Sequence, residues 1–231
     1  MKKSEWNSTP GSYDSLHTGL LFNADSDLGI PVVKREELEN FPEFLVPYGT
    51  EVRRSLASAR GGCCHFFLDD YRFESLWNKP VKTLEPIKRQ KLTLSPDFSL
   101  YTNYPLALQI YNVYRNRYLA RYWQENGVVV IPTVAWSDER SYAFAFCGLK
   151  NCDMLAISTV GVNNSKNSVK LFIEGVRHML QLRHVGKLTF TRLIVYGSIP
   201  KELIDVLTKE GVEYREYKDY WANKNSKSKQ Q

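Results

Sequence analysis

Short apolar runs alternate with longer amphipathic segments between residues 63 and 217. The runs are too short for helices and are rich in apolar, β-branched or aromatic residues, which predicts buried strands. We expect these strands at 64–68, 98–101, 128–131, 154–159, 192–196 and 212–217. The longer segments repeat apolar residues at helical spacing, which predicts helices at 104–126, 169–182 and 201–209. Residues 142–146 fit either a strand or a short helix.

Continuous apolar strands that alternate with helices are typical of a mainly parallel sheet flanked by helices. The predicted order, β-β-α-β-β-α-β-α-β, favours an α/β fold resembling an incomplete (β/α) barrel, because eight clean units are not visible. A doubly wound open sheet is the alternative. We expect one α/β domain over 30–218, in which 30–60 is a wrapping segment with short strands. Residues 1–29 are expected to form a flexible arm, and 219–231 a disordered basic tail.

Composition narrows the class of protein. A chain of 231 residues, 43% of them hydrophobic, is long enough for one sizeable core. Its net charge of +6 suits a polyanionic partner, although part of this charge lies in the predicted tail. Four cysteines are too few for a disulfide framework at this length, and we see no signal peptide or long apolar run. We therefore expect a reduced, cytoplasmic protein with no membrane partner.

The helix predicted at 104–126 carries an arginine on its broad apolar face. Arg115 lies near the middle of the face formed by Ala107, Leu108, Tyr111, Tyr114, Tyr118, Leu119 and Tyr122. A core-facing guanidinium needs a partner, so Arg115 either pins a loop carboxylate or helps to hold an anion. Arg117 and Arg121 point roughly the opposite way, and we expect them to be solvated. In the next helix, His178 falls off the apolar stripe and is expected to be exposed.

Polar side chains gather where the predicted strands end, which is where parallel α/β folds place function. The run HFFLDDYRFE at 65–74 passes abruptly from apolar residues into two carboxylates, Asp69 and Asp70. Strand alternation sends these two side chains to opposite faces. Such carboxylates serve as an acid and base pair, or hold a divalent cation for phosphoryl chemistry. We expect one of them to share a polar cluster with Asp97 and Arg115.

Ten residues make up the candidate site. The candidate catalytic residues are Asp69, Asp70 and Asp97. The candidate substrate-binding residues are Arg115, Thr102, Asn112, Trp136, Asp138, Ser158 and Tyr196. Structural roles are also open for three of them. Asp70 fits a helix cap, Asp69 fits a partner for Arg72 or Arg115, and Asp138 fits an N-cap.

Several familiar sites are not indicated. Cys63, Cys64, Cys147 and Cys152 lack the spacing typical of zinc. A divalent cation held by the strand-end carboxylates is the cofactor that the sequence leaves open. His65 fits a buried core histidine better than a ligand or a base. The sequence contains neither a phosphate-binding glycine loop nor the elbow of a nucleophilic serine.

Longer blocks of the sequence resemble the bacterial and phage family called domain of unknown function 4417. They are HFFLDDYRFESLWNKP (65–80), SPDFSLYTNYPLALQIYNVYRNRYLARYWQENG (95–127), VVVIPTVAWSDERSYAFAFCGL (128–149), AISTVG (156–161) and VYG (195–197). The similarity extends from Val32 to Tyr217. The resemblance implies a phage, plasmid or other mobile-element context, but no established activity and no catalytic residues to transfer.

Three classes of function remain in view. The mobile-element context, the charge and the aromatic residues favour binding or processing of nucleic acid, although no DNA-binding motif is recognised. A small (β/α)-barrel-like enzyme that acts on a nucleotide or sugar through its strand-end carboxylates is the first alternative. A phage-encoded interaction protein that inhibits a host system is the second.

Overall fold

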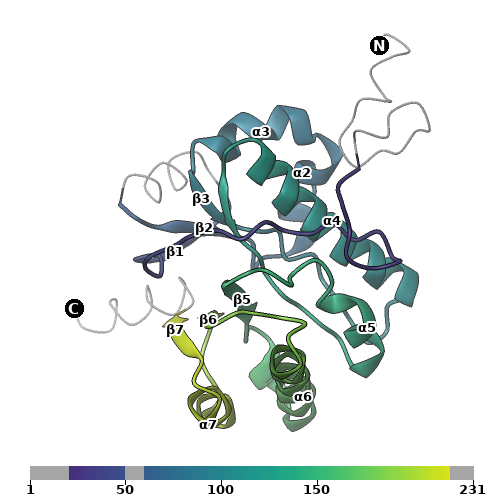
Figure 1. The fold of residues 1–231 in the computed structure, drawn as a ribbon, viewed down its shortest axis with the longest axis vertical. Helices are drawn as coiled ribbons and strands as arrows, with labels where there is room; N and C mark the ends of the chain where they lie inside the picture. The colour runs from purple at the N-terminus through teal and green to yellow at the C-terminus, as the bar shows by residue number, and fades with distance from the viewer. Residues whose placement is uncertain (1–20, 50–59, 219–231) are drawn as a thin grey trace.

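The computed structural model describes residues 21–49 and 60–218, which form two parallel sheets flanked by helices (Figure 1). The first sheet has the strand order β1-β2-β3-β4 and the second β5-β6-β7. Their bounds are β1 Leu45–Pro47, β2 Cys63–His65, β3 Leu92–Leu94, β4 Val129–Ile131, β5 Met154–Ser158, β6 Arg192–Tyr196 and β7 Glu213–Tyr217. Every pairing between these described strands is parallel, so the predicted α/β class is confirmed, although the sheets do not close into a barrel.

The two sheets join at one edge and curve around a shared interior. A parallel bridge between Thr133, just after β4, and Ala156 of β5 connects them. His65 of β2 and Tyr196 of β6 are not on neighbouring strands, yet their ring centroids lie only 4.3 Å apart. The strands therefore follow one another around the interior in chain order, as they would in an incomplete barrel.

Helices connect the strands and cover the outer faces of the sheets. They are α2 Ser75–Asn78, α3 Pro80–Lys88, α4 Leu106–Glu125, α5 Tyr142–Ala145, α6 Lys166–His184 and α7 Lys201–Lys209. Short 3-10 turns lie at η3 Asp70–Arg72, η4 Glu139–Ser141 and η5 Val162–Asn164. The three predicted helices are thus confirmed, and the ambiguous segment begins as a helix. None of the described helices is long and apolar enough to cross a membrane.

The strand predicted at 98–101 is wrong, and the strand of this region, β3, lies earlier at Leu92–Leu94. The ladder stops at Ser95, whose N–H donates to the carbonyl of Ile131, because the next residue is Pro96 and has no N–H. Phe98 is nevertheless buried, since it packs against Phe73 in the loop that follows. The apolar residues at 98–101 were therefore predicted as a strand because the loop that contains them is partly buried.

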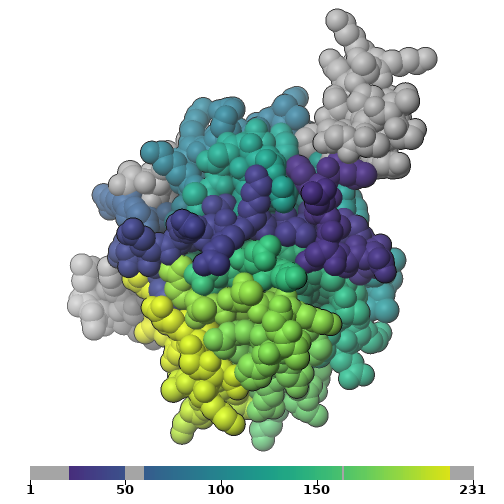
Figure 2. All heavy atoms as spheres, in the orientation of Figure 1, coloured from purple at the N-terminus to yellow at the C-terminus, as the bar shows by residue number. Residues whose placement is uncertain are grey.

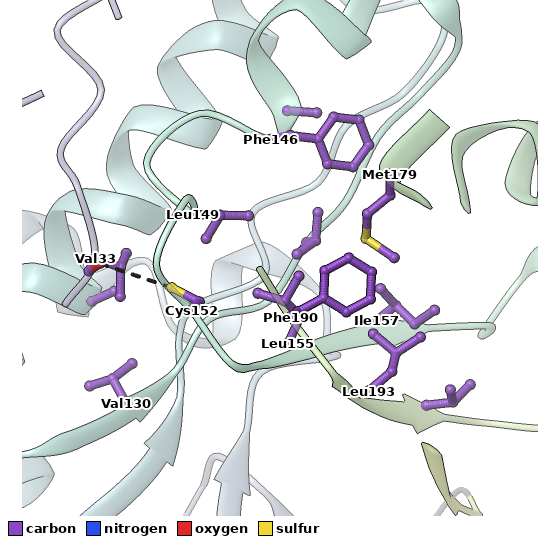
Figure 3. Packing of buried hydrophobic residues seen from close by; sticks show 14 of the residues in the cluster. Val33, Val130, Phe146, Leu149, Cys152, Leu155, Ile157, Met179, Phe190 and Leu193 are labelled. Carbon is purple, nitrogen blue, oxygen red and sulfur yellow. Dashed lines mark hydrogen bonds between the residues drawn. The ribbon is translucent and has the colours of Figure 1, made fainter. Parts of the chain in front are cut away.

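Two layers of buried apolar side chains stabilise the fold. The inner layer lies between the curved sheets and includes Cys63, Leu94, Ile131, Met154, Ile194 and Tyr217. The outer layer lies between the strands and the helices, where Met179 of α6 packs near Ile157 of β5 (Figure 3). In the same view the thiol of Cys152 donates a long hydrogen bond, 3.9 Å, to the carbonyl of Val33.

The N-terminal segment wraps the domain. In Figure 2 it crosses the molecule as a purple band between the teal and green parts. Arg192 of β6 donates to the carbonyl of Leu38 at 2.6 Å, and the hydroxyl of Tyr217 of β7 donates to the carbonyl of Pro42. The wrapping segment predicted from residue 30 is therefore confirmed over 30–49.

Part of the predicted arm also contacts the domain. A carboxylate oxygen of Asp25 accepts the N–H of Gly148 at 3.0 Å, and the ring of Phe22 lies 4.9 Å from that of Tyr118. Residues 1–20 of the arm and the predicted tail, 219–231, lie outside the described residues.

The predicted solvation of Arg117 and Arg121 is wrong. Arg117 is 1% exposed, and its guanidinium donates to the carbonyls of Thr133, Ala145 and Cys147 at 2.8, 2.9 and 3.1 Å. Burial lowers the pKa of Arg117 to about 10, which leaves it charged at neutral pH. Arg121 is largely covered as well. Loops that offer carbonyl groups cover this face of α4, and a guanidinium satisfies several of them at once.

Candidate functional site

A cleft with a volume of about 460 Å³ opens at the carboxyl ends of β2, β3, β4 and β5. Four of the ten candidate residues line it: Asp69, Asp97, Trp136 and Ser158. The rest of the lining consists of Phe67, Leu68, Arg72, Ser99, Leu100, Tyr101, Val134, Ala135, Val160, Val162 and Phe172. The cleft thus lies where parallel α/β folds place their functional groups.

Asp97 is the carboxyl group of the cleft lining whose pKa is strongly shifted. The residue is partly exposed, but its Oδ1 atom is fully buried and has no hydrogen-bond partner among the described residues. Burial, and secondly the charge of Asp70, raise the pKa of Asp97 from 3.8 to about 7, while Arg117 opposes this rise. A carboxyl group whose pKa lies near neutrality is a candidate for a functional group.

A buried polar network holds the loop that carries Asp97. Asn116 of α4 donates to the carbonyl of Pro96 at 2.7 Å and to the hydroxyl of Thr133 at 2.8 Å. Ser95 in turn donates to the amide oxygen of Asn116 at 2.9 Å. These contacts fix the loops that follow β3 and β4 against one helix, so the position of Asp97 is set by rigid elements.

Asp69 and Asp70 have different surroundings, although strand alternation is not the reason, because β2 ends at His65 and Asp70 begins the η3 turn. Asp70 accepts the backbone N–H of Ser99, at 3.1 Å, and its hydroxyl, at 2.8 Å. Asp69 is exposed, lines the cleft, and makes no cap bond to the η3 turn that follows it. Asp69 is therefore available to a ligand, whereas Asp70 supports the loop beside Asp97.

Arg115 is buried, as its position on the helix predicts, but its carboxylate partner is Glu74 rather than a candidate aspartate. The two side chains meet at 2.7 Å, and the guanidinium carbon lies 3.8 Å from the ring centroid of Phe98. A second guanidinium nitrogen donates to Asn112 at 2.6 Å, and Asn112 donates to the carbonyl of Ser99 at 2.7 Å. Arg115 and Asn112 thus reach Asp70 only indirectly, and neither lines the cleft.

Trp136 forms an aromatic wall of the cleft. Its ring stacks on Phe172 of α6, with centroids 5.3 Å apart and an interplanar angle of 28°. On the side of α6, Gly175 lies so close that an added Cβ would come within 2.0 Å of the indole nitrogen. The glycine therefore allows the indole to pack directly on the helix backbone.

The remaining candidates lie outside the cleft lining. Thr102 is exposed, and its carbonyl accepts from Arg140. Asp138 accepts the N–H of Arg140 as the cap of η4, and hydrogen bonds from the side chain of Arg140 lower the pKa of Asp138. Tyr196 is buried in the interior, where it stacks on Phe67. For Asp138 the structural alternative, an N-cap, is the one observed.

The sequence reasoning missed several residues that shape this site. Asn116 and Ser95 hold the Asp97 loop, and Phe172 supports the tryptophan wall. The sequence signal that could have revealed Asn116 was a polar asparagine within an otherwise apolar helix face.

Within residues 21–49 and 60–218, no three His, Cys, Asp or Glu side chains are grouped so that they could hold a metal ion.

Comparisons with known proteins extend this description. The chain is 36% identical over 218 residues to the "Gene 1 protein" of Mycobacterium phage L5, covering 94% of this chain and 90% of that protein. It is 34% identical over 216 residues to the "Gene 1 protein" of Mycobacterium phage D29, covering 94% and 76%. No solved structure matches at a significant level. Residues 22–218 match the family described as Domain of unknown function (DUF4417), and the chain belongs to that family.

Proposed function

We propose that the chain is an enzyme that acts on a nucleotide or a sugar in the strand-end cleft, with Asp97 as its general acid or base. The observation that carries this proposal is the carboxyl group of Asp97, a residue of the cleft lining whose pKa is raised to about 7 and whose Oδ1 atom is buried without a partner among the described residues. A group with such a pKa donates or accepts a proton near neutral pH at little cost.

The lining of the cleft suits a ring that carries hydroxyl groups. Trp136 offers an aromatic face, while Asp69 and Ser158 offer oxygen acceptors or a hydroxyl donor nearby. Arg72 adds one positive charge at the same cleft, where it could meet a phosphate. The volume of about 460 Å³ falls within the range of small-molecule sites.

Ligand-induced thermal stabilisation and turnover test the proposal together. A panel of nucleosides, nucleotides and monosaccharides is screened against the parent chain, Asp97→Asn and Asp205→Asn. Asp205 is an exposed aspartate of α7 outside the cleft lining, so its variant is a matched control. We expect a compound that stabilises all three proteins but is converted only by the parent and the control. Equal turnover by Asp97→Asn would remove Asp97 from the chemistry.

A second candidate is binding of single-stranded nucleic acid across the mouth of the same cleft. Tyr101 lines the cleft together with Arg72 and is 54% exposed. Tyr71, which precedes Arg72 in the sequence, is 78% exposed. Exposed aromatic rings stack bases, and each stacked base contributes about 1–3 kcal/mol. Binding of a fluorescent oligonucleotide that weakens with salt and with Tyr101→Ala would support it. Binding unaffected by that substitution would move any nucleic-acid contact elsewhere.

A further inference from the structure

A second cavity, of about 580 Å³, lies between α5 and α6 on the outside of the sheets. Its lining includes Tyr142, Cys147, Lys150, His178, Lys187 and Leu188. The lining of this cavity shares no residue with that of the strand-end cleft, so the two hollows are separate. The size of the second cavity is again that of a small-molecule site.

One wall of this cavity is a stacked pair of rings. Tyr142 of α5 and His178 of α6 lie with their centroids 4.6 Å apart and their planes 20° from parallel. His178 is half-buried rather than exposed as its position off the apolar stripe predicted. Burial, followed by the charge of Lys187, lowers the pKa of His178, which favours the neutral imidazole. The wall therefore presents uncharged aromatic surface to an occupant.

The rim of the cavity is cationic. Lys150 and Lys187 are both exposed, and neither ammonium group has a carboxylate within ion-pair distance among the described residues. Asp25 carries the one carboxylate among the described lining residues, and it accepts the N–H of Gly148 at 3.0 Å. Two unpaired ammonium groups beside an aromatic wall favour a ligand that carries a negative charge.

We propose that this cavity binds a flat aromatic molecule that bears an anionic group. The ring stacks on the Tyr142–His178 pair and contacts Leu182 and Leu188, while the anion lies between Lys150 and Lys187. The proposal does not rest on the function proposed for the strand-end cleft.

Cys147 provides a reporter inside the cavity. Its side chain lines the hollow and is half-buried, whereas Cys63, Cys64 and Cys152 are buried. Burial raises the pKa of the Cys147 thiol, so alkylation by iodoacetamide is slow but directed to this cysteine. A ligand in the cavity shields the thiol and slows alkylation further.

The probe is 8-anilinonaphthalene-1-sulfonate, an anionic aromatic fluorophore, and its neutral counterpart is N-phenyl-1-naphthylamine. We expect the anionic probe to bind with saturable fluorescence and to slow alkylation of Cys147 at least about fivefold at saturation. The double variant Lys150→Glu, Lys187→Glu should weaken the anionic probe by about tenfold or more, equivalent to about 1.4 kcal/mol. The neutral probe should be affected much less, because charge reversal leaves the aromatic wall intact.

Three controls keep the outcome decisive. Asp97→Asn should leave probe binding unchanged, since Asp97 lies in the other cleft. Cys147→Ser should abolish the alkylation signal. Tyr142→Leu should weaken both probes, and circular dichroism checks that the variants fold. Binding that leaves Cys147 unprotected, that survives charge reversal, or that Asp97→Asn removes would each overturn the proposal.

Discussion

Replacing Asp97 by asparagine tests the electrostatics of the cleft through stability as well as activity. The pKa of Asp97 is about 7 in the folded protein and 3.8 when unperturbed. Between these values the unfolded chain releases its proton while the folded chain retains it. The contribution of Asp97 to the free energy of unfolding therefore falls by about 1.4 kcal/mol for each pH unit in this window.

Asparagine resembles the protonated carboxyl group and does not titrate. Asp97→Asn should match the parent below pH 4 and become the more stable protein as the pH rises. The difference should grow by about 2 to 3 kcal/mol between pH 5 and pH 7 and then level off. Because the residue is only partly buried, access of water to its second oxygen reduces this figure.

Urea unfolding at pH 5, 6, 7 and 8, followed by circular dichroism, measures this difference directly. Asp205→Asn serves as the control, because an exposed aspartate should give a difference from the parent that is nearly independent of pH. A difference between Asp97→Asn and the parent that stays constant from pH 5 to pH 7 would refute the reasoning. In that case neither burial nor Asp70 raises the pKa of Asp97, and the proposed acid–base role loses its basis.

Three further substitutions test the support of the site. Asp70→Asn should lower stability by about 1–2 kcal/mol, because Ser99 loses a charged acceptor, and urea unfolding should show non-additivity with Ser99→Ala. Arg117→Met should cost about 3 kcal/mol or more in thermal unfolding, since it leaves buried carbonyl groups unpaired; a loss below about 1 kcal/mol would contradict this. Gly175→Ala should displace Trp136, which changes its fluorescence and costs about 1–3 kcal/mol; an unchanged emission spectrum would contradict the packing.

The regular part of the fold was predictable because its elements are locally encoded. β6 has the predicted bounds, and α6 extends the predicted helix at both ends, because their apolar residues repeat at the period of the element. Three-residue strands such as β1 and β3 are too short for any period to be visible. α3 carries Pro80 at its start and Pro86 within it, and these prolines conceal a helix from propensity arguments.

The location of the candidate site could be predicted from the sequence, but the full set of residues that form it could not. Strand ends are readable from the sequence, so Asp69, Trp136 and Ser158 were found and do line one cleft. Asp97 lines it too, but it follows a strand only because β3 lies earlier than the strand predicted at 98–101. The partner of Arg115 was not readable, because Glu74 lies on a different element, and only the fold brings the two together. Tyr196 ends its strand as expected but faces the interior, since one position along a strand reverses the face.

Helix α4 explains why periodicity failed where it mattered most. Three of its polar side chains donate to loop carbonyls: Asn112 to Ser99, Asn116 to Pro96, and Arg117 to Thr133. Irregular backbone has no ladder to satisfy its carbonyl groups, so a helix that packs against it needs donors rather than apolar residues. A helical wheel assigns such residues to solvent. Because the accepting loops are those that follow β3 and β4, the buried polar face of α4 determines where Asp97 lies in the cleft.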